Sequence, residues 1–222
     1  MKQELAGIAF DLDGTLYPNY RLFIRLAPFI VKHGRLLWAM GKARNILRAE
    51  NSEGPFYDLQ ARIAAKFLKE EPRIVKERLE ALIYRGWEPL FRKIKPYTHV
   101  RETLEALRQR GFKLGILSDF PPVEKLEYLG LGGLWDTVLC SEETGRLKPD
   151  PLPFFTLAAS LDLPPERILY VGNSQRYDVG GAKKTGMRTA LIRLLGRTHF
   201  SSPKKADFIF FDYRQLYHYV IN

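Results

Sequence analysis

Short runs of consecutive apolar residues recur along the chain, and polar side chains follow most of them. Such a run is typical of a strand that is buried on both faces of a parallel sheet. The first run covers Leu5–Phe10. Five more lie in the second half of the chain: Phe112–Leu117, Thr137–Cys140, Ile168–Val171, Thr189–Ile192 and Ala206–Phe211. The pattern therefore predicts six strands.

Segments with helical periodicity separate the later runs. They cover Val100–Arg110, Pro122–Leu129, Pro153–Leu161 and Asp178–Thr185. In the first of them Leu104 and Leu107 share an apolar face, and Gly111 is a suitable residue to end the helix. Strands that alternate with helices in this rhythm predict an α/β fold with a mostly parallel sheet.

Residues 20–95 interrupt this alternation, because they contain amphipathic stretches and no clear strand. The most regular of these stretches are Asp58–Lys69 and Pro72–Tyr84. Active-site loops in open α/β sheets lie at the carboxyl ends of strands, so a long helical insertion after the first strand predicts a lid or cap. We therefore expect a catalytic core of residues 1–19 and 96–222 and a helical cap of residues 20–95.

Positive charge is concentrated in this predicted cap. The chain has 222 residues and a net charge of +10, and residues 20–95 hold 17 Lys and Arg against 8 Asp and Glu. This excess indicates an anionic substrate or partner, and a solvated helical surface explains it equally well. The single cysteine, Cys140, excludes an internal disulfide and favours a reducing cytoplasm. Charged residues and Pro28 interrupt the apolar segment Leu22–Met40, so no membrane-spanning helix is expected.

The basic residues of the predicted cap alternate with aromatic ones, which leaves a non-enzymatic binding role open. Cations near Phe23, Phe29 and Trp38 suit a nucleic acid or an anionic membrane surface. A cap helix that packs its apolar face on the core explains the same pattern, and we favour it. The cations are Arg21, Arg25, Lys32, Arg35, Lys42, Arg44 and Arg48.

Four polar segments stand at or shortly after predicted strands. They are Asp11-Leu12-Asp13-Gly14-Thr15, Leu117-Ser118-Asp119, Arg146-Leu147-Lys148-Pro149-Asp150-Pro151 and Gly172-Asn173 through Asp178. The carboxyl ends of parallel strands share one edge of a sheet, so these segments are expected to form one site. Any one of them alone is a common turn or helix cap, and their combination in this order is what carries the prediction.

Phosphoryl transfer accounts for these residue types. A carboxylate nucleophile such as Asp11 splits one difficult step into two through an aspartyl-phosphate. A second carboxyl group, Asp13, can protonate the leaving oxygen and later deprotonate water. Roughly four negative charges then meet at the site, so cations are required. Mg²⁺ suits a site with few carboxylates, and Lys148 is the candidate fixed cation, with Ser118 and Asp119 completing the predicted substrate-binding set.

Together these segments resemble the haloacid dehalogenase superfamily of hydrolases. Asp11-Leu12-Asp13-Gly14-Thr15-Leu16 matches the first motif of that family in full, and Ser118 matches the second. Lys148-Pro149-Asp150-Pro151 matches the third, and Gly172 through Asp178 with Gly181-Ala182 resembles the fourth. The resemblance spans roughly residues 5–210 without the insertion. It implies a Rossmann-like parallel core, with the insertion at the family's cap position between its first and second motifs.

The resemblance also implies a role for each matching residue. Asp11 is expected to be the nucleophile and a metal ligand, and Asp13 the acid/base that also binds the metal through its backbone carbonyl. Ser118 is expected to bind phosphate, Lys148 to hold both nucleophile and phosphate, and Asp178 to complete the Mg²⁺ site.

One residue departs from the family pattern, since the fourth motif commonly opens with Gly-Asp and here has Asn173. A neutral amide oxygen in the metal set predicts weaker Mg²⁺ binding with activity retained. The acid at Asp13 favours a phosphatase acting on a small phosphate ester over a dehalogenase, because an alkoxide needs a proton to leave. No obligate nucleic-acid partner is expected. A phosphomutase of the same family stays open, as do the basic binding module, the substrate and the oligomeric state.

Overall fold

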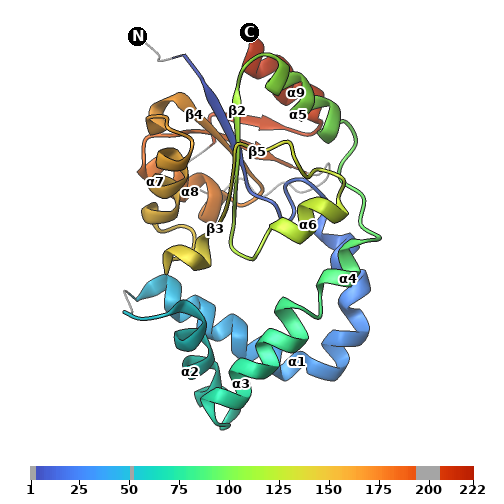
Figure 1. Ribbon diagram of the computed structural model, residues 1–222, viewed down its shortest axis with the longest axis vertical. Coiled ribbons are helices and arrows are strands. Elements are labelled where there is room, and N and C mark those ends of the chain that lie inside the picture. The colour runs from blue at the N-terminus through green and yellow to red at the C-terminus, as the bar shows by residue number, and fades with distance from the viewer. Residues whose placement is uncertain (1–3, 51–52, 194–205) are drawn as a thin grey trace.

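Six parallel strands form one sheet at the centre of the computed structural model, which describes residues 4–50, 53–193 and 206–222. Along the sheet the strands are ordered β3 (Thr137–Cys140), β2 (Lys113–Ser118), β1 (Gly7–Phe10), β4 (Ile168–Gly172), β5 (Arg188–Ile192) and β6 (Phe208–Phe210). All six predicted strands are present, and the Rossmann-like α/β fold class is confirmed (Figure 1). The central strand β1 pairs with β2 on one side and with β4 on the other.

Helices cover both faces of the sheet, and the alternation of side chains along β1 shows how. Ile8 and Phe10 belong to the hydrophobic cluster on the face that carries α5 (Val100–Gln109) and α9 (Tyr213–Ile221). Ala9 belongs to the cluster on the opposite face, with α7 (Pro151–Ser160) and α8 (Gly180–Lys184). Consecutive residues of a strand point to opposite faces, so a wholly apolar β1 requires this two-sided cover.

The remaining predicted helices of the second half agree with the structure to within a few residues. The short α6 (Val123–Tyr128) follows β2. A π-helical turn, Gln175–Val179, precedes α8, so the predicted helix Asp178–Thr185 begins in that turn. The C-terminal helix α9 was not predicted.

The insertion folds into helices, as the sequence indicated. They are α1 (Asn19–Ala49), α2 (Phe56–Leu68), α3 (Pro72–Leu79) with a π-helical continuation Glu80–Tyr84, and α4 (Glu88–Phe91). These helices have a hydrophobic cluster of their own, to which α1, α2 and α3 all contribute. The division of the chain into a core and a cap at residues 20 and 95 stays a prediction. Residues 1–3, 51–52 and 194–205 of these two parts lie outside the described residues.

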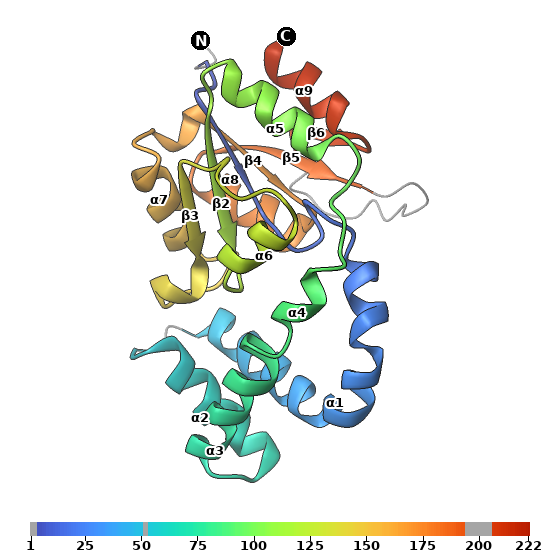
Figure 2. The same cartoon turned by 45° about the vertical axis from the view of Figure 1, so that its right-hand side comes forward.

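Helix α1 bends near its middle. His33 departs from helical geometry with φ −125° and ψ 18°, and Pro28 and Gly34 stand on either side of it. Proline removes a helical hydrogen bond and glycine adds backbone freedom, which are common causes of a bend. Figures 1 and 2 show α1 descending from the core and then crossing beneath the sheet. Its last turns therefore lie close to the carboxyl ends of the strands.

The expected packing of the basic stretch on the core is only partly correct. Phe29 packs against the main hydrophobic cluster, which contains residues of β1 and β2. Phe23 and Trp38, in contrast, are 58% and 51% exposed. Across the described ranges of the chain, every helix is too short or too polar to cross a lipid bilayer.

Candidate active site

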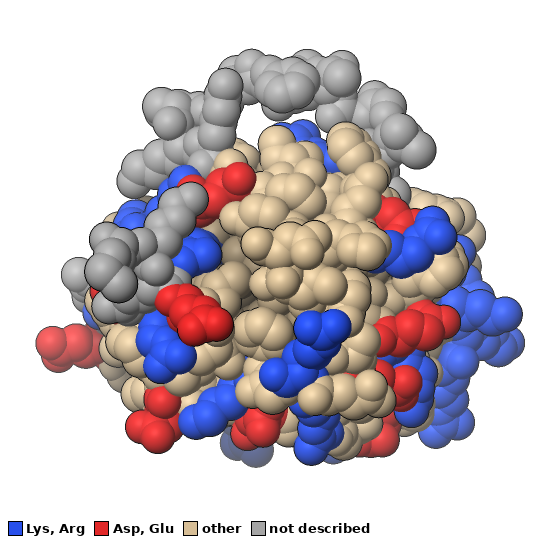
Figure 3. Space-filling model, turned by 90° about the horizontal axis from the view of Figure 1, so that it is seen from above, with Lys and Arg blue, Asp and Glu red and all other residues tan. Residues whose placement is uncertain are grey.

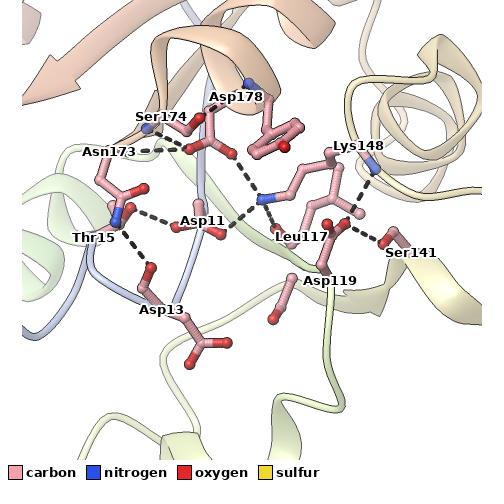
Figure 4. A network of polar contacts seen from close by, with 12 residues as sticks. Asp11, Asp13, Thr15, Leu117, Asp119, Ser141, Lys148, Asn173, Ser174 and Asp178 are labelled. Atoms are coloured by element: carbon pink, nitrogen blue, oxygen red, sulfur yellow. Dashed lines mark hydrogen bonds and ion pairs between the residues drawn. The ribbon is translucent and has the colours of Figure 1, made fainter. Parts of the chain in front are cut away.

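The four predicted segments meet at the carboxyl edge of the sheet (Figure 4). Asp11 follows β1, Ser118 ends β2, and Asp178 lies in the π-helical turn after β4. Lys148 lies in the loop between the short 3-10 helix that follows β3 and the start of α7. Parallel neighbours in register bring these strand ends together although the residues are far apart in the chain.

The Lys148 ammonium group is at the centre of the site. It donates to Asp11 Oδ1 at 2.7 Å and to Asp178 Oδ1 at 2.8 Å, and it also reaches the carbonyl of Leu117 and the hydroxyl of Tyr170, both at 3.3 Å. Burial alone would lower the pKa of Lys148, but the two carboxylates raise it well above its usual value. Lys148 is therefore a permanent cation between two acids.

The buried position of Asp11 disfavours its ionised form. Burial raises the pKa of Asp11 to about 7, with Asp178 adding to the rise while Lys148 and Thr15 oppose it. The Thr15 hydroxyl donates to Asp11 Oδ2 at 2.6 Å. One lysine thus compensates two buried carboxylates only in part, so the site favours a further cation.

The donors around this position fit Mg²⁺. Asp11 and Asp178 supply two carboxylates, and the backbone carbonyl of Asp13 lies beside the Asn173 amide, which donates to it at 2.9 Å. Asp178 Oδ2 accepts the backbone N–H groups of Asn173 and Ser174 at 3.1 and 2.9 Å. Mg²⁺ is commonly held by one or two carboxylates with water and substrate oxygens. Within the described ranges, no group of three or more His, Cys, Asp or Glu side chains is arranged to hold a metal ion, so other oxygens would have to complete the set of ligands.

The carboxyl group of Asp13 faces away from Lys148, as Figure 4 shows. It accepts the Tyr17 hydroxyl at 2.5 Å and the Lys125 ammonium at 3.0 and 2.8 Å. Lys125 lies on α6 and also contacts the rings of Phe91 and Phe120. Sequence reasoning missed both Tyr17 and Lys125, because neither is next to a predicted strand end.

The carboxylate of Asp119 accepts hydrogen bonds from several groups of the protein. It accepts the Ser141 hydroxyl at 2.5 Å, the backbone N–H of Lys148 at 3.1 Å and the Arg48 guanidinium at 2.8 Å. Burial would raise the pKa of Asp119, but Lys148 with Arg44 and Arg48 lowers it below its ordinary value. The predicted substrate role of Asp119 stays a prediction, and its observed contacts fix the loop of Lys148.

The hydroxyl of Ser118 is fully buried and accepts the backbone N–H of Phe120 at 3.2 Å. Its hydrogen remains available to a ligand oxygen, because a hydroxyl both donates and accepts. Toward the described residues the Ser118 hydroxyl acts only as an acceptor, so it can donate to a ligand oxygen.

Two arginines near the end of α1 bind residues of the loops around this site. Arg48 donates to the backbone carbonyl of Lys148 at 3.0 Å in addition to Asp119. Arg44 forms a buried ion pair with Glu142 and donates to the carbonyl of Asp119 at 2.6 Å. These contacts connect residues 71 to 100 positions apart, so the sequence pattern could not indicate them.

A cleft of about 330 Å³ opens beside these contacts, between the insertion and the loop after β2. Its lining includes Tyr57, Gln60 and Tyr84 from the insertion and Pro121 from the loop. The hydroxyls of Tyr57 and Tyr84 donate to Glu142 at 3.1 and 2.9 Å.

The profile of the haloacid dehalogenase-like hydrolase family matches residues 5–186. The chain belongs to that family. It is 31% identical to a glyceraldehyde 3-phosphate phosphatase of Methanopyrus kandleri over 91% of this chain and 90% of that protein. A phosphoglycolate phosphatase of Haemophilus influenzae is 29% identical over 97% and 98% of the two chains. The predicted family and the hydrolase class are thus confirmed.

The fold is shared with solved structures of the family. A dehalogenase with an intermediate complex superposes with a TM-score of 0.70 at 20% identity, over the full length of both chains. At this identity the likeness concerns the fold alone. Inferences about chemistry therefore rest on the family's motifs and on the geometry around Lys148.

Proposed function

We propose that this family member is a Mg²⁺-dependent phosphatase that hydrolyses small phosphate monoesters through an aspartyl-phosphate. The observation that carries the proposal is the Lys148 ammonium bridging Asp11 and Asp178 at the edge of the sheet. The relatives named above are phosphatases of small phosphorylated carbon compounds, which supports the same reaction class here.

In the first step an oxygen of Asp11 attacks phosphorus, and the bond between phosphorus and the ester oxygen breaks. Asp13 gives its proton to the departing alkoxide, which leaves as an alcohol. In the second step Asp13 takes a proton from water, and the resulting hydroxide attacks the aspartyl-phosphate. Phosphate leaves, and Asp11 is a carboxylate again with Asp13 protonated, so the cycle closes.

A small cavity next to the partner of Asp13 supports the proposed acid/base role. This partner, Lys125, lines the cavity between the insertion and the core, together with Trp87 and Phe120. A leaving group that extends from Asp11 toward the insertion would meet the Asp13 carboxyl group on this side. The side chain must release Lys125 or Tyr17 to exchange a proton, because both partners donate to its oxygens.

Lys148 and Ser118 would bind phosphate oxygens, since an ammonium and a hydroxyl both donate hydrogen bonds to them. Asp11 and Asp178, with the carbonyl of Asp13 and the amide of Asn173, would hold Mg²⁺. When bound, the ion would neutralise negative charge on the phosphate and the two carboxylates.

Two cations of the insertion next to the site have anionic partners within the protein. Arg44 is paired with Glu142 and Arg48 with Asp119. A preference for a substrate with a second anionic group stays a prediction, as do the cytoplasmic location and the phosphomutase alternative.

Phosphate release from phosphoglycolate, glyceraldehyde 3-phosphate and an aryl phosphate tests the proposal, measured with Mg²⁺ and with EDTA. Release is expected only with Mg²⁺ and is expected to disappear in Asp11→Asn. The matched control is Asp162→Asn, which changes a fully exposed acid in the same way. Wild-type turnover by Asp11→Asn would show that Asp11 is not the nucleophile. Transfer of phosphate to a second substrate without net release would instead indicate the mutase.

A further inference from the structure

Helix α1 has an apolar face that the described part of the chain leaves exposed. Its inner residues Leu22 and Leu26 are buried in the main hydrophobic cluster. The outer stripe, which we call the α1 stripe, consists of Tyr20, Phe23, Ile24, Ile30 and Val31, which are 52%, 58%, 67%, 41% and 88% exposed. Their spacing follows one side of a helix with 3.6 residues per turn.

This stripe is unusual within the molecule. Of the large hydrophobic side chains that are exposed in the described residues, half lie on α1, where Trp38 follows the stripe after the bend. Single exposed apolar residues are normal on a protein surface, but a continuous row of them marks an interaction site. In Figure 2 the first half of α1 runs along the outer side of the molecule, away from the sheet.

Uncompensated positive charge borders the stripe. Residues 19–49 contain seven Arg and Lys and no Asp or Glu. Arg21 and Arg25 donate to the backbone carbonyls of Lys95 and Lys93 at 3.0 and 2.9 Å, which engages only part of each guanidinium and does not cancel its charge. Among the described residues, these four cations and Lys32 form no ion pair.

The end of the molecule that carries the two termini has a different distribution of charge. Seen from the end that carries the two termini, Lys and Arg alternate with Asp and Glu around an uncharged centre (Figure 3). The combination of a row of apolar side chains with cations of a single sign therefore distinguishes α1 from that face.

Charge decides between the possible occupants of the stripe. A second copy of this chain would bring the same cations against one another, which opposes a symmetric dimer through this face. Nucleic acid would satisfy the cations, but its phosphates and sugars would leave Ile24 and Val31 without an apolar partner. An anionic lipid surface satisfies both, because an amphipathic helix buries its apolar side at the boundary of headgroups and acyl chains while its cations meet lipid phosphates.

We propose that the α1 stripe docks the protein on an anionic lipid surface, with Arg21, Arg25 and Lys32 contacting the headgroups. The inference is independent of the phosphatase proposal, since the stripe lies outside the cluster of Asp11, Lys148 and Asp178.

Sedimentation with lipid vesicles tests the inference on the full chain. Vesicles of phosphatidylcholine with about 30% phosphatidylserine are compared with vesicles of phosphatidylcholine alone. Binding is expected only to the anionic vesicles, and it should weaken about tenfold or more when salt rises from about 50 mM to about 300 mM.

Two double variants separate the stripe from exposed apolar residues in general. Ile24→Glu with Val31→Glu is expected to lower binding by about tenfold or more. The control, Ile74→Glu with Val123→Glu, changes the same residue types at 50% and 55% exposed positions on α3 and α6 and should bind as the wild type does. Ile24→Ser with Val31→Ser tests the apolar contribution without adding charge, and thermal unfolding checks that each variant is folded.

Three results would overturn the inference. The first is absence of binding to the anionic vesicles at low salt. The second is equal loss of binding in the stripe variants and in the control. The third is a dimer in light scattering, or retention on duplex DNA, that the stripe variants abolish while vesicle binding stays unchanged.

Discussion

Replacing Asp11 by asparagine is expected to stabilise the metal-free protein while it removes the proposed nucleophile. Asp11 is only 6% exposed and lies beside a second buried carboxylate, Asp178. In the absence of divalent cations, Lys148 alone compensates the two acids. Asparagine has nearly the same shape and keeps an oxygen that accepts from Lys148, but it carries no charge. The substitution therefore removes a buried charge without opening a cavity.

The pKa of Asp11 gives the size of the effect. It is about 7 in the folded protein, against an ordinary value of 3.8. At pH 8 the folded protein therefore ionises Asp11 at a cost of about 4 kcal/mol relative to the unfolded chain. An asparagine at this position avoids the cost, so the variant is expected to be more stable by up to about 4 kcal/mol in EDTA.

The gain should depend on pH in a defined direction. Because the folded pKa is raised, Asp11 contributes stability that is fully present below pH 3.8 and is lost as the pH rises through about 7. The difference between variant and wild type is therefore expected to be largest above pH 7 and to fall to about 2 kcal/mol or less at pH 5.

Urea unfolding in EDTA at pH 5 and pH 8 measures this difference, with Asp162→Asn as the control for a surface acid. The control should stay within about 0.5 kcal/mol of wild type at both pH values. Coincident unfolding curves of Asp11→Asn and wild type at pH 8 would refute the reasoning, and so would a gain that grows on acidification. Saturating Mg²⁺ should stabilise the wild type more than the variant, because the ion needs both carboxylates.

Three further changes test the rest of the site. Lys148→Met should lower kcat for phosphate release by about 10²- to 10³-fold, and an unchanged kcat would remove Lys148 from the mechanism. Arg48→Ala should lower kcat about tenfold, because the backbone carbonyl of Lys148 loses its hydrogen-bond donor. The control Arg35→Ala breaks a contact within the insertion and should leave kcat unchanged. Equal effects of the two substitutions on kcat would contradict this prediction. Asn173→Asp should raise Mg²⁺ affinity about tenfold in titration calorimetry by adding a charge, and an unchanged affinity would exclude residue 173 from the metal site.

The hydrophobic pattern was sufficient to locate the sheet. All six apolar runs contain strands. Every residue of the central strands β1 and β4 is buried, which explains their continuous apolar character, whereas Ile209 on the edge strand β6 is 38% exposed. The chemistry-bearing residues could be recognised for a related reason. Asp11, Ser118, Lys148 and Asp178 come at or shortly after strands, where a parallel sheet brings polar groups to one edge.

Contacts between distant parts of the chain could not be predicted in this way. Lys125 binds Asp13 across 112 positions, and Arg48 reaches the carbonyl of Lys148 across 100. A surface lysine and a lysine that holds an acid look alike in sequence, since both are charged residues on short amphipathic helices. Only the packing of α6 and α1 against the sheet edge distinguishes them.

Helix α1 shows most directly what sequence and tertiary structure each decide. The sequence determined that the helix is basic and apolar, because those properties belong to its residues alone. Whether Phe23, Ile24 and Val31 would be covered depended on which neighbours the fold provides, and α4 and the core cover only the opposite side. Burial is a property of pairs of surfaces, so periodicity can identify an apolar face but only the tertiary structure shows whether anything packs against it.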